Sequence, residues 1–589
     1  MPPWPFDWLP QLPVYAYGPA SNQFFVIDDR DFDYPSYWTS LAAATANSGG
    51  MGAMLVSGPP PLPGSGGTNS SGGGGGTSLP MPAFSTNDLW LEIVTLTNRT
   101  NAVLVIHTPS YFTNGLYNLF YTTNLAPPIS WQLIMSNVPG NRHFTVSNAT
   151  DPQGFYCLGL ANSSEGTDFW IAFMTTVADE SAVCSLFISS QVAATGTVSN
   201  PYPGNAFSIN FSVMPGVVTN IILPYWATIS ANNGYGLIQP FGMHITTTQP
   251  VSVYGLSYVP FGSSALTFYP TPMLGTRYSL MARPAGVPSS DWFSEFAIVA
   301  TADNTTVWIT PSTNANLAWY AGIVSNIITL DQGNTFQINS STWSNDVTGT
   351  LISSDQPIAV FAGANGAYVP DANTVQGNPL VQEQLPEASW GTRVLALSFA
   401  GRTNGDSYRV LAATDSTAVT VVTANGAVTN NLEAGHFFDT NLGGWVQFNA
   451  NNPIQVAQFA NGASFDNTHN EEGDPLEMLL LPTGHYLTSY TIAIPDYVDE
   501  LGDPFETFVN VILPQSAILA TTMDGEVITN VVAITNFVQI GTSGYSGARV
   551  SVSNGSTHTI TSSHPLELQV YGFGYYDAYG YIGGLNNFP

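Results

Sequence analysis

The alternation of apolar and polar residues along this chain predicts an all-β protein in which one pattern recurs four times. Each copy consists of a strand, a polar stretch that ends in proline, and a second strand of alternating apolar residues. The four prolines are Pro250, Pro357, Pro453 and Pro565. Because proline donates no backbone hydrogen bond, we expect each one in a turn at the entry of the second strand. A recurrence at intervals of about a hundred residues predicts a β-unit repeated in tandem.

Two further patterns keep the same order in successive units. Residues 296–310 and 408–422 each contain an apolar strand, a turn rich in Asp, Asn and Thr, and a β-branched strand, which together predict a β-hairpin. A shorter pattern that begins with proline opens three of the units, at residues 272, 386 and 482. Three patterns in one constant order are therefore independent support for the repeat.

The patterns divide the chain into seven segments. These are an extended aromatic and proline-rich arm at 1–58, a Pro/Gly/Ser linker at 59–86, a small β-sandwich at 87–162, and four β-repeats at 166–262, 263–370, 379–465 and 475–585. About seven strands in each repeat favour antiparallel β-sandwich-like units of about 100 residues. Similar hairpins within one repeat leave a second interpretation open, a β-propeller built from half-repeats of about 50 residues.

Charged side chains are scarce, and those present are mostly acidic. The 589 residues include 39 Asp and Glu against nine basic residues, all of them Arg, and the formal net charge is -30. Nucleic acid is not expected as a partner, because phosphate contacts need a basic face, and an anionic membrane surface is disfavoured for the same reason. Uncharged polar residues must then cover the surface, which is typical of secreted β-proteins.

The chain shows no membrane-spanning or export signal. No apolar stretch approaches the roughly 20 residues that a membrane-spanning helix needs. The first residues, Met-Pro-Pro-Trp-Pro-Phe-Asp-Trp, have neither the basic nor the apolar region of a signal peptide. We expect an extracellular or cell-surface protein whose export signal is not visible in this chain.

The chain has two cysteines, Cys157 and Cys184. In an extracellular protein we expect them to form a disulfide, which would join the small β-sandwich to an early strand of the first repeat. Two buried free thiols are the alternative.

Two acidic loops are candidate calcium sites, and no other metal or cofactor is expected. Glu472 and Asp474 lie in the first loop, and Asp496, Asp499 and Asp503 lie in the second. Carboxylates crowded in this way repel each other unless a cation or protons intervene, so we predict calcium at one or both loops. Ordinary solvated loop charge is the other interpretation.

The sequence favours a protein without enzymatic activity. It contains none of the short motifs that mark zinc peptidases, α/β-hydrolases, phosphate-binding loops or dinucleotide sites. A glycosidase would need two carboxylates facing each other across a cleft, and loop clusters do not indicate one.

Aromatic residues crowd the end of the last repeat. They are Tyr571, Phe573, Tyr575, Tyr576, Tyr579 and Tyr581. Mixed with glycine, they predict either a seam between domains or a surface on which a glycan stacks.

The order of the repeated patterns, with residues 473–482 and 564–584, resembles the IgG-Fc-binding-protein N-terminal domain family. The resemblance covers about 166–585. It implies a secreted protein, here a bacterial extracellular member, with a binding, adhesion or matrix role. It does not imply antibody binding, because the family has no motif for that contact that could be carried over to residues of this chain.

The N-terminal arm suggests how such a protein assembles. It carries Trp4, Phe6, Trp8, Tyr15 and Tyr17, which are costly to leave in water and lack a pattern that would form a core. An extended segment can add to the open sheet edge of a neighbour, so we predict self-assembly into a filament or surface layer through this arm. In the alternative the arm folds back on its own sandwich, and the chain is a monomeric secreted binding module for glycans or host proteins.

Overall fold

A computed structural model places the chain in two compact units, residues Met1–Ala161 with Phe588–Pro589 and residues Asn162–Asn587. The described residues of the first, N-terminal unit are its strands between 14 and 160. Those of the second, C-terminal unit are 162–587, apart from 176–181, 203–205, 230–234, 260, 289–290, 319–325, 372, 375 and 467–471. Each unit is described by itself.

The described strands of the N-terminal unit form two antiparallel sheets. The first has the order β2-β1-β8-β5-β6 and the second β3-β4-β7. Their bounds are β1 Val14–Gly18, β2 Gln23–Ile27, β3 Trp90–Thr97, β4 Asn101–His107, β5 Leu116–Thr122, β6 Gln132–Pro139, β7 His143–Ser147 and β8 Gly154–Leu160.

Part of the predicted extended arm is a β-hairpin in this unit's own sheet. Strand β1 lies between β2 and β8, with Tyr15 opposite Tyr156 and Tyr17 opposite Gly154. Both short segments are rich in aromatic and β-branched residues, which suits a pleated strand, and pairing satisfies their backbone groups. Both edges of β1 are therefore occupied within the chain. Trp4, Phe6 and Trp8 lie outside the described residues.

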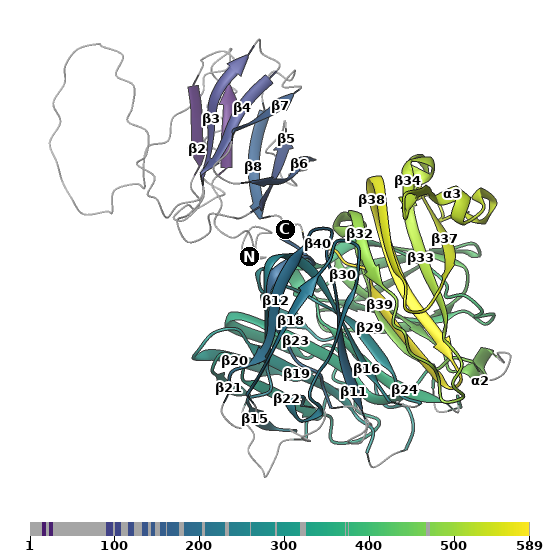
Figure 1. The fold of residues 1–589 in the computed structure, drawn as a ribbon. Helices are drawn as coiled ribbons and strands as arrows, with labels where there is room; N and C mark the ends of the chain where they lie inside the picture. The colour runs from purple at the N-terminus through teal and green to yellow at the C-terminus, as the bar shows by residue number, and fades with distance from the viewer. Residues whose placement is uncertain are drawn as a thin grey trace. The chain divides into compact units, whose positions relative to one another are not determined.

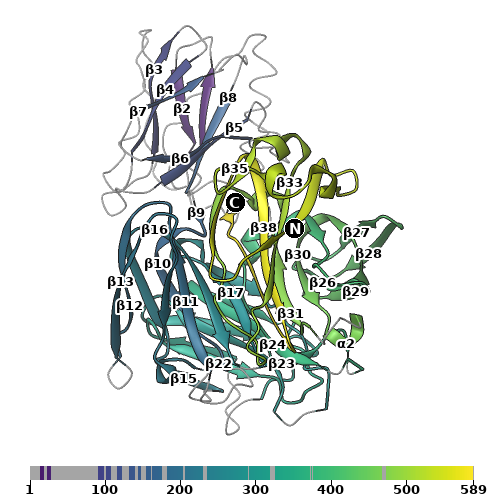
Figure 2. The same ribbon diagram turned by 45° about the vertical axis from the view of Figure 1, so that its right-hand side comes forward.

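The C-terminal unit is built on four antiparallel sheets, each organised around one long strand. The long strands are β16 Met243–Tyr258, β23 Leu351–Tyr368, β30 Trp445–Ala460 and β38 Thr557–Gly574. Strand β38, yellow in Figure 1, runs the length of the fourth sheet, and Figure 2 shows the other sheets beside it. The nearly all-β fold with repeated antiparallel sheets confirms the predicted fold class.

The shorter elements of each sheet are as follows. The first sheet adds β10 Gly166–Ile171, β11 Val183–Ser189, β12 Ala194–Asn200, β13 Phe207–Val213, β14 Thr219–Ile222 and β17 Ser264–Phe268. The second adds β15 Leu237–Gln239, β18 Gly275–Ser279, β19 Ser294–Ala300, β20 Thr305–Thr310, β21 Ile327–Leu330, β22 Thr335–Asn339 and β24 Gly377–Glu383. The third adds β25 Gly391–Leu397, β26 Asp406–Ala412, β27 Thr417–Thr423, β28 Gly426–Leu432, β29 Phe437–Leu442 and β31 Leu476–Leu480. The fourth adds β32 Leu487–Ala493, β33 Glu506–Pro514, β34 Thr521–Met523, β35 Glu526–Val527, β36 Val538–Gln539, β37 Tyr545–Val552 and β39 Asp577–Ile582.

Helices in the described part of this unit are short, three to six residues each. They are η1 Tyr225–Ala227, η3 Thr271–Met273, η5 Glu387–Ser389, α2 Ala463–Asp466, η7 Thr483–His485, η8 Gln515–Ala520, α3 Ile528–Val531 and η9 Ile534–Asn536. None of the helices in the described ranges has the length and hydropathy that crossing a membrane requires.

The repeated proline lies within each long strand, and the predicted turn between two strands is wrong. In the third sheet Gly391 pairs with Ile454 and Arg393 with Asn449, so four residues of β30, ending at Pro453, have no partner in β25 and form a bulge in that ladder. The half of β30 before the bulge pairs with β25 and β27, and the half after it pairs with β26 and β31. A bulge needs no backbone donor at its end, so proline fits there.

Each long strand thus belongs to two layers and holds a two-sheet sandwich together. The other three sheets show the same register shift between their long strand and β10, β18 or β32. Strands that pass from one layer to the other at a bulge are a known way of making the corner of a sandwich. The sandwich interpretation therefore describes the individual repeat better than half-repeat blades.

The strand that follows each long strand belongs to the same sheet, which moves the predicted repeat boundaries. Strand β17 pairs with β16 of the first sheet, although the prediction started the second repeat at residue 263. Strands β24 and β31 likewise pair with β23 and β30 before them. Local sequence does not encode which neighbour a strand will pair with. The pattern therefore predicted the length of the repeat but placed each boundary one strand too early.

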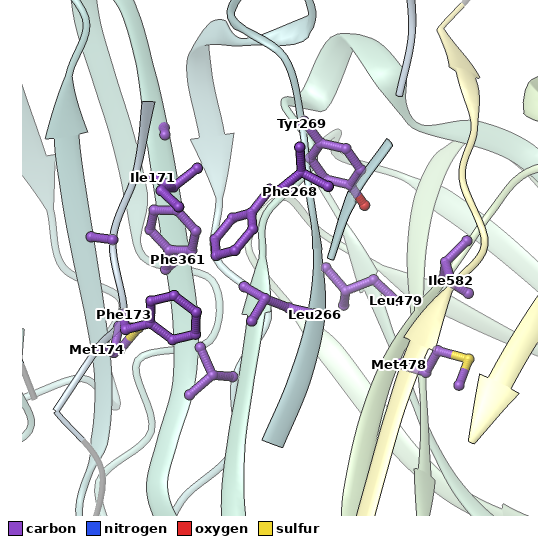
Figure 3. Close-up of a cluster of buried hydrophobic side chains, with 14 of the residues drawn as sticks. Ile171, Phe173, Met174, Leu266, Phe268, Tyr269, Phe361, Met478, Leu479 and Ile582 are labelled. Carbon is purple, nitrogen blue, oxygen red and sulfur yellow. The ribbon is translucent and has the colours of Figure 1, made fainter. Parts of the chain in front are cut away.

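The four sandwiches close into a ring. Strand β17 contacts β24 and β39, and β31 contacts the same two strands, so the last strand of every sheet meets at one centre. Strand β9, Asn162–Ser163, pairs with β40, Asn586–Asn587, and joins the two ends of the unit. Figure 3 shows the core between them, with Phe268, Phe361, Met478 and Ile582 from four different sheets.

Two buried amide side chains satisfy backbone groups at this centre. Asn378 Nδ2 lies 2.9 Å from the carbonyl oxygen of Ser263 and 3.0 Å from those of Pro475 and Ala578. Gln382 Nε2 lies 2.9 Å from the carbonyl oxygen of Ala265 and also donates to carbonyls at the third and fourth sheets. Both residues belong to β24, so one strand supplies hydrogen bonds to all three other sheets.

Successive sandwiches also meet at a repeated glycine and proline. A Cβ on Gly275 would lie 2.5 Å from the Pro386 Cβ, and one on Gly391 would lie 2.4 Å from the Pro482 Cβ. Pro386 and Pro482 are the first residues of the proline-led pattern found in the sequence. In the structure they are the N-cap residues of η5 and η7. Glycine is needed at both positions because a side chain would separate the two repeats.

Candidate functional site

A cavity of about 390 Å³ opens on the fourth sheet where two acidic stretches meet the end of β38. Its lining residues, the acidic pocket, are Glu472, Asp499, Leu501, Asp503, Pro504, Glu506, Phe573, Gly574 and Tyr575. The cavity is at the lower end of the size range of ligand pockets in proteins. It combines four carboxylates with two aromatic rings, and no basic side chain lines it.

Asp499 builds one wall of the pocket. Its Oδ1 accepts hydrogen bonds from the backbone N–H groups of Leu501 at 2.9 Å and Asp503 at 3.0 Å. Its Oδ2 accepts from the N–H of Tyr575 at 2.9 Å. A buried carboxylate that accepts three backbone donors fixes its loop, and here it also attaches the loop to the end of β38. Asp499 is therefore a structural residue of the site.

The other acidic stretch meets the same strand end through its backbone. Glu472 forms an isolated β-bridge with Tyr575, and the N–H of Gly473 donates to the carbonyl of Gly574 at 2.7 Å. Residues that are about thirty positions apart in the sequence thus line one cavity. The side chains of Asp503 and Glu506 complete its acidic lining.

An aromatic cluster extends from the edge of the pocket. The rings of Tyr575 and Tyr576 are 4.4 Å apart, and the ring of Phe261 lies 6.3 Å from Tyr575 and 6.4 Å from Tyr576. Phe261 and Tyr576 have φ angles of 64° and 48°, a left-handed conformation that is rare for large side chains. Phe261 is also 45% exposed. Backbone strain and an exposed ring at one place mark this edge as a candidate contact surface.

The ring of Phe573, which lines the pocket, is covered by an arginine from the interior of the protein. The guanidinium carbon of Arg402 lies 4.1 Å from the centre of the Phe573 ring, and the Arg402 side chain is buried 3.6 Å from Asp466. At the end of β38, Arg402 therefore lies between the ring of Phe573 and the carboxylate of Asp466, inside the protein.

The predicted calcium ligands are divided between different places. Glu472, Asp499 and Asp503 share the acidic pocket, whereas Asp496 is exposed and lies against Gly555. Asp474 is buried, and burial, with Asp577 nearby, raises the pKa of its carboxyl well above the usual range. A protonated acid is a poor calcium ligand. In the described ranges no three His, Cys, Asp or Glu side chains are grouped to hold a metal ion, and calcium stays a prediction.

Cys184 is a buried free thiol in this structure. Its Sγ lies 3.9 Å from Ser257 Oγ, and burial raises the pKa of the thiol to about 12. The side chain of Cys157 lies outside the described residues. The predicted disulfide therefore stays a prediction, which mass spectrometry after non-reducing digestion would test.

The aromatic residues at the end of the last repeat lie in two different places, and the predicted glycan-stacking surface stays a prediction. Tyr571, Tyr579 and Tyr581 are buried, and the hydroxyl of Tyr571 donates to Asn510 Oδ1 at 2.8 Å. They form the seam between sheets. Tyr575, and with it Tyr576, lies at the pocket instead.

One Ser–His–Asp arrangement occurs in the described residues, and it does not form a nucleophilic site. Ser556 Oγ lies 2.8 Å from His558 Nε2, and His558 Nδ1 lies 2.7 Å from Asp524 Oδ2. The Ser556 hydroxyl, however, donates its proton to the carbonyl of Ser553. A hydroxyl whose proton is held by a backbone carbonyl is not activated by the histidine, so these contacts stabilise the turn.

Sequence reasoning missed Phe261 and Leu501 as members of the site. Leu501 is 63% exposed at the pocket, and Phe261 approaches from the turn after β16. The only sequence signal was that a glycine directly follows each of these large apolar residues.

Comparisons with known proteins agree with the repeat region. The sequence model of a family described as IgGFc binding protein matches residues 263–572. The human IgGFc-binding protein is 26% identical over 316 residues, which is 52% of this chain and 5% of the human protein. The alignment thus spans only a small part of that relative.

A comparison with solved structures adds no argument about the fold. A Ca²⁺-stabilized adhesin by which an Antarctic bacterium binds ice is 10% identical, over 65% of this chain and 94% of that chain. The TM-score of 0.09 is too low for a shared fold.

Proposed function

This chain belongs to the IgGFc-binding protein family, and from that premise we propose that it is an extracellular binding module whose partner contacts the acidic pocket. The observation that carries the proposal is the pocket itself. Four carboxylates and two aromatic rings line one cavity, and two aromatic residues with a left-handed backbone, the exposed Phe261 and the half-buried Tyr576, continue its edge. Aromatic residues are enriched where proteins bind each other.

The family name does not identify the partner. The human relative is named for binding the Fc part of immunoglobulin G, but the similar segment is 5% of that protein. A protein partner is the class that the family supports, and Fc is one member of that class to be tested. Glycans are the competing class.

The module acts without catalysis in this proposal. The family is one of binding proteins, and the Ser556 hydroxyl is bonded to a backbone carbonyl instead of being held ready for attack. The exposed carboxylates of the pocket, Asp503 and Glu506, then serve recognition.

Self-assembly through the N-terminal arm receives less support than the binding module. An arm that adds to a neighbour's sheet needs a free strand edge, whereas β1, with Tyr15 and Tyr17, pairs on both sides within the chain. Filament or surface-layer formation through Trp4, Phe6 and Trp8 stays a prediction.

The proposal is tested by binding of the immobilised full chain to a panel of immunoglobulin Fc, secreted mucins and purified glycans. The double variant Asp503→Asn/Glu506→Gln removes two exposed pocket charges. Glu500→Gln/Glu526→Gln removes two exposed charges that do not line the pocket and is the matched control. We expect a protein of the panel to bind and the pocket variant to weaken it at least fivefold more than the control. Equal binding by both variants would refute the pocket as the contact site.

A further inference from the structure

We propose that strand β28, Gly426–Leu432, pairs with the same strand of a second copy of this chain, so that two molecules share one continuous sheet. This interaction surface lies on the third sandwich and is independent of the acidic pocket.

Strand β28 is the open edge of one layer of the third sandwich. It pairs with β27 on one side, and β27 pairs in turn with the first half of β30. On its other side β28 has no strand partner within the described residues. Figure 2 shows β27 and β28 at the outer side of the C-terminal unit. An edge strand presents a row of unpaired backbone groups to the solvent.

One hydrogen bond of β27 fixes the direction in which its residues face. The N–H of Ala418 donates to the side chain of Asn451, which belongs to β30. The backbone groups of successive residues in a strand point alternately to its two sides. The even-numbered residues of β27 therefore face β30, and the odd-numbered ones face β28.

The register then identifies the outward groups of β28. The odd-numbered residues of β27 pair with the even-numbered residues of β28, and these pairs carry the hydrogen bonds between the two strands. Ala427, Thr429 and Asn431 therefore direct their backbone N–H and C=O groups away from the sheet. In the described part of the chain no hydrogen bond reaches these outward groups.

The strands at the same place in the other three sandwiches, β13, β21 and β35, are short or partly covered. In β13 the carbonyl of Ser212 accepts the hydroxyl of Thr219 at 2.7 Å. Strand β21 has four residues, and β35 has two and is in contact with α3. Strand β28 has seven residues and contains no charge, no proline and no bulge. Since natural proteins protect edge strands by these devices, the unprotected β28 indicates a strand partner.

A second copy of β28 fits this edge about a two-fold axis through Thr429. In that antiparallel pairing Thr429 lies opposite the Thr429 of the second copy, and Ala427 lies opposite Asn431, once on each side of the axis. Each of these three pairs exchanges two hydrogen bonds, so all six outward groups of each strand are used. The hydroxyl of Thr429 lies 2.9 Å from that of Thr420 in β27, so it does not compete for the outward groups.

The side chains along β28 also suit pairing with itself. Val428 is 65% exposed, and the pairing makes it the diagonal neighbour of the Val428 of the second copy, on the same face at about 7–8 Å. Glu433 directly follows the strand and lies opposite Asn425 of the second copy. The net charge of -30 therefore places no like charges opposite each other at this interface. A two-fold contact uses the same surface on both molecules, so it closes as a dimer.

The first test is the molar mass of the full chain, measured by analytical ultracentrifugation over a hundredfold range of concentration. We expect an equilibrium between monomer and dimer. Thr429→Pro removes one outward donor from each strand and should weaken the dimer at least tenfold. Ala424→Pro, in the exposed turn of the same hairpin, is the matched control and should change dimerisation less than twofold.

A second variant changes the side chain instead of the backbone. Val428→Lys should weaken the dimer at least tenfold, because it places two like charges beside the axis, although it lowers the net negative charge that opposes association. Val192→Lys makes the same change of charge at an exposed valine of the first sandwich and should have no such effect. Circular dichroism would confirm that each variant is folded.

Cross-linking tests the register. Opposite residues of a hydrogen-bonded pair have Cα atoms about 5.5 Å apart, within the range that a disulfide bridges. We therefore expect oxidised Thr429→Cys to form a covalent dimer on non-reducing electrophoresis, beyond any that the wild type forms. Asn425→Cys is the control, because its two copies would lie about 27 Å apart, at about 3.4 Å for each residue of the strand.

Three results would overturn the inference. They are a chain that is monomeric at every concentration, a dimer that Thr429→Pro and Val428→Lys leave intact, and equal cross-linking of Thr429→Cys and Asn425→Cys. If the chain is monomeric and Thr429→Pro instead weakens a protein of the panel, that partner supplies the strand and the second copy is wrong. The pocket variant Asp503→Asn/Glu506→Gln should leave the dimer unchanged, so the proposed function and this inference can fail separately.

Discussion

Asn378 and Gln382 show how much of this fold depends on single side chains. Two N–H bonds of the Asn378 amide are shared among three backbone carbonyls that come from three different sheets. Those carbonyls face the centre of the ring, where water is excluded. In a sequence, Asn and Gln within a strand suggest exposed positions. Their role as donors to buried carbonyls could not be predicted, because those carbonyls belong to other sheets.

Asn378→Asp is predicted to destabilise the C-terminal unit. The substitution keeps the shape but replaces the donor with oxygen, so buried carbonyls lose their partner at a cost of about 1–3 kcal/mol for each unsatisfied group. Chemical denaturation should show a lower midpoint of unfolding. Asn425→Asp, in an exposed turn, is the control and should leave the midpoint almost unchanged. Equal midpoints for the two variants would contradict the role given to Asn378.

At the scale of elements, the long bent strand is the feature that the sequence predicted only in part. The positions of the four prolines gave the repeat, and the alternation after each proline gave a strand. The sequence analysis predicted that the first strand ends before the proline and that a second strand begins after it, because proline cannot donate a hydrogen bond to a ladder. In the structure the ladder changes partners at that point, and a bulge accommodates the missing donor. Pairing partners far away in the sequence decide between these two outcomes.

The acidic pocket was predictable to a similar extent. Both acidic loops were identified as candidate ligand sites from their carboxylates. That both loops line one cavity was not predictable, because it depends on Asp499 and Glu472 both contacting Tyr575, directly after β38.

Gly391→Ala is predicted to weaken the junction between the third and fourth sandwiches. The new Cβ would lie 2.4 Å from the Cβ of Pro482, closer than packed atoms allow, so the turn before η7 must shift. Overpacking of this kind costs about 1–3 kcal/mol. Gly484→Ala, in the same turn with nothing within 4 Å of the added atom, should be neutral or slightly stabilising. Thermal unfolding of the two variants side by side measures the difference, and the prediction fails if Gly391→Ala melts at the temperature of the wild type.

At the scale of the whole molecule, ring closure distinguishes this protein from a row of repeats. Composition and period predicted tandem sandwiches, and the structure contains them. Closure follows from contacts between strands hundreds of residues apart, such as β17 with β39, and from the pairing of β9 with β40. The closed ring also places many polar groups in its interior, including several carboxyls.

These buried carboxyls are predicted to make the protein less stable as the pH rises. Burial raises the pKa of Glu295 and Glu477 to about 8 and that of Glu165, Asp406, Glu567 and Asp577 to about 7. A carboxyl whose pKa is raised in the folded state stabilises it fully below the pKa of the unfolded chain, near 4.5 for Glu. That contribution to stability is lost as the pH rises through the pKa that the carboxyl has in the folded protein.

The melting temperature should therefore fall between about pH 5 and pH 8. Glu295→Gln keeps the hydrogen bonds of this side chain to Tyr235 and Gln337 within reach but removes its proton, so its melting temperature should fall less over the same range. Glu500→Gln, at an exposed position, is the control and should follow the wild type. A melting temperature that rises from pH 5 to pH 8 would show that these carboxyls do not govern stability.

The central claim, that the acidic pocket is where this protein binds its partner, is tested most directly by a crystal structure of the full chain with the protein of the panel that it binds. The account predicts that the bound protein contacts Asp503, Glu506 and the ring of Tyr575. A partner bound at another surface, with the pocket filled by solvent, would contradict it.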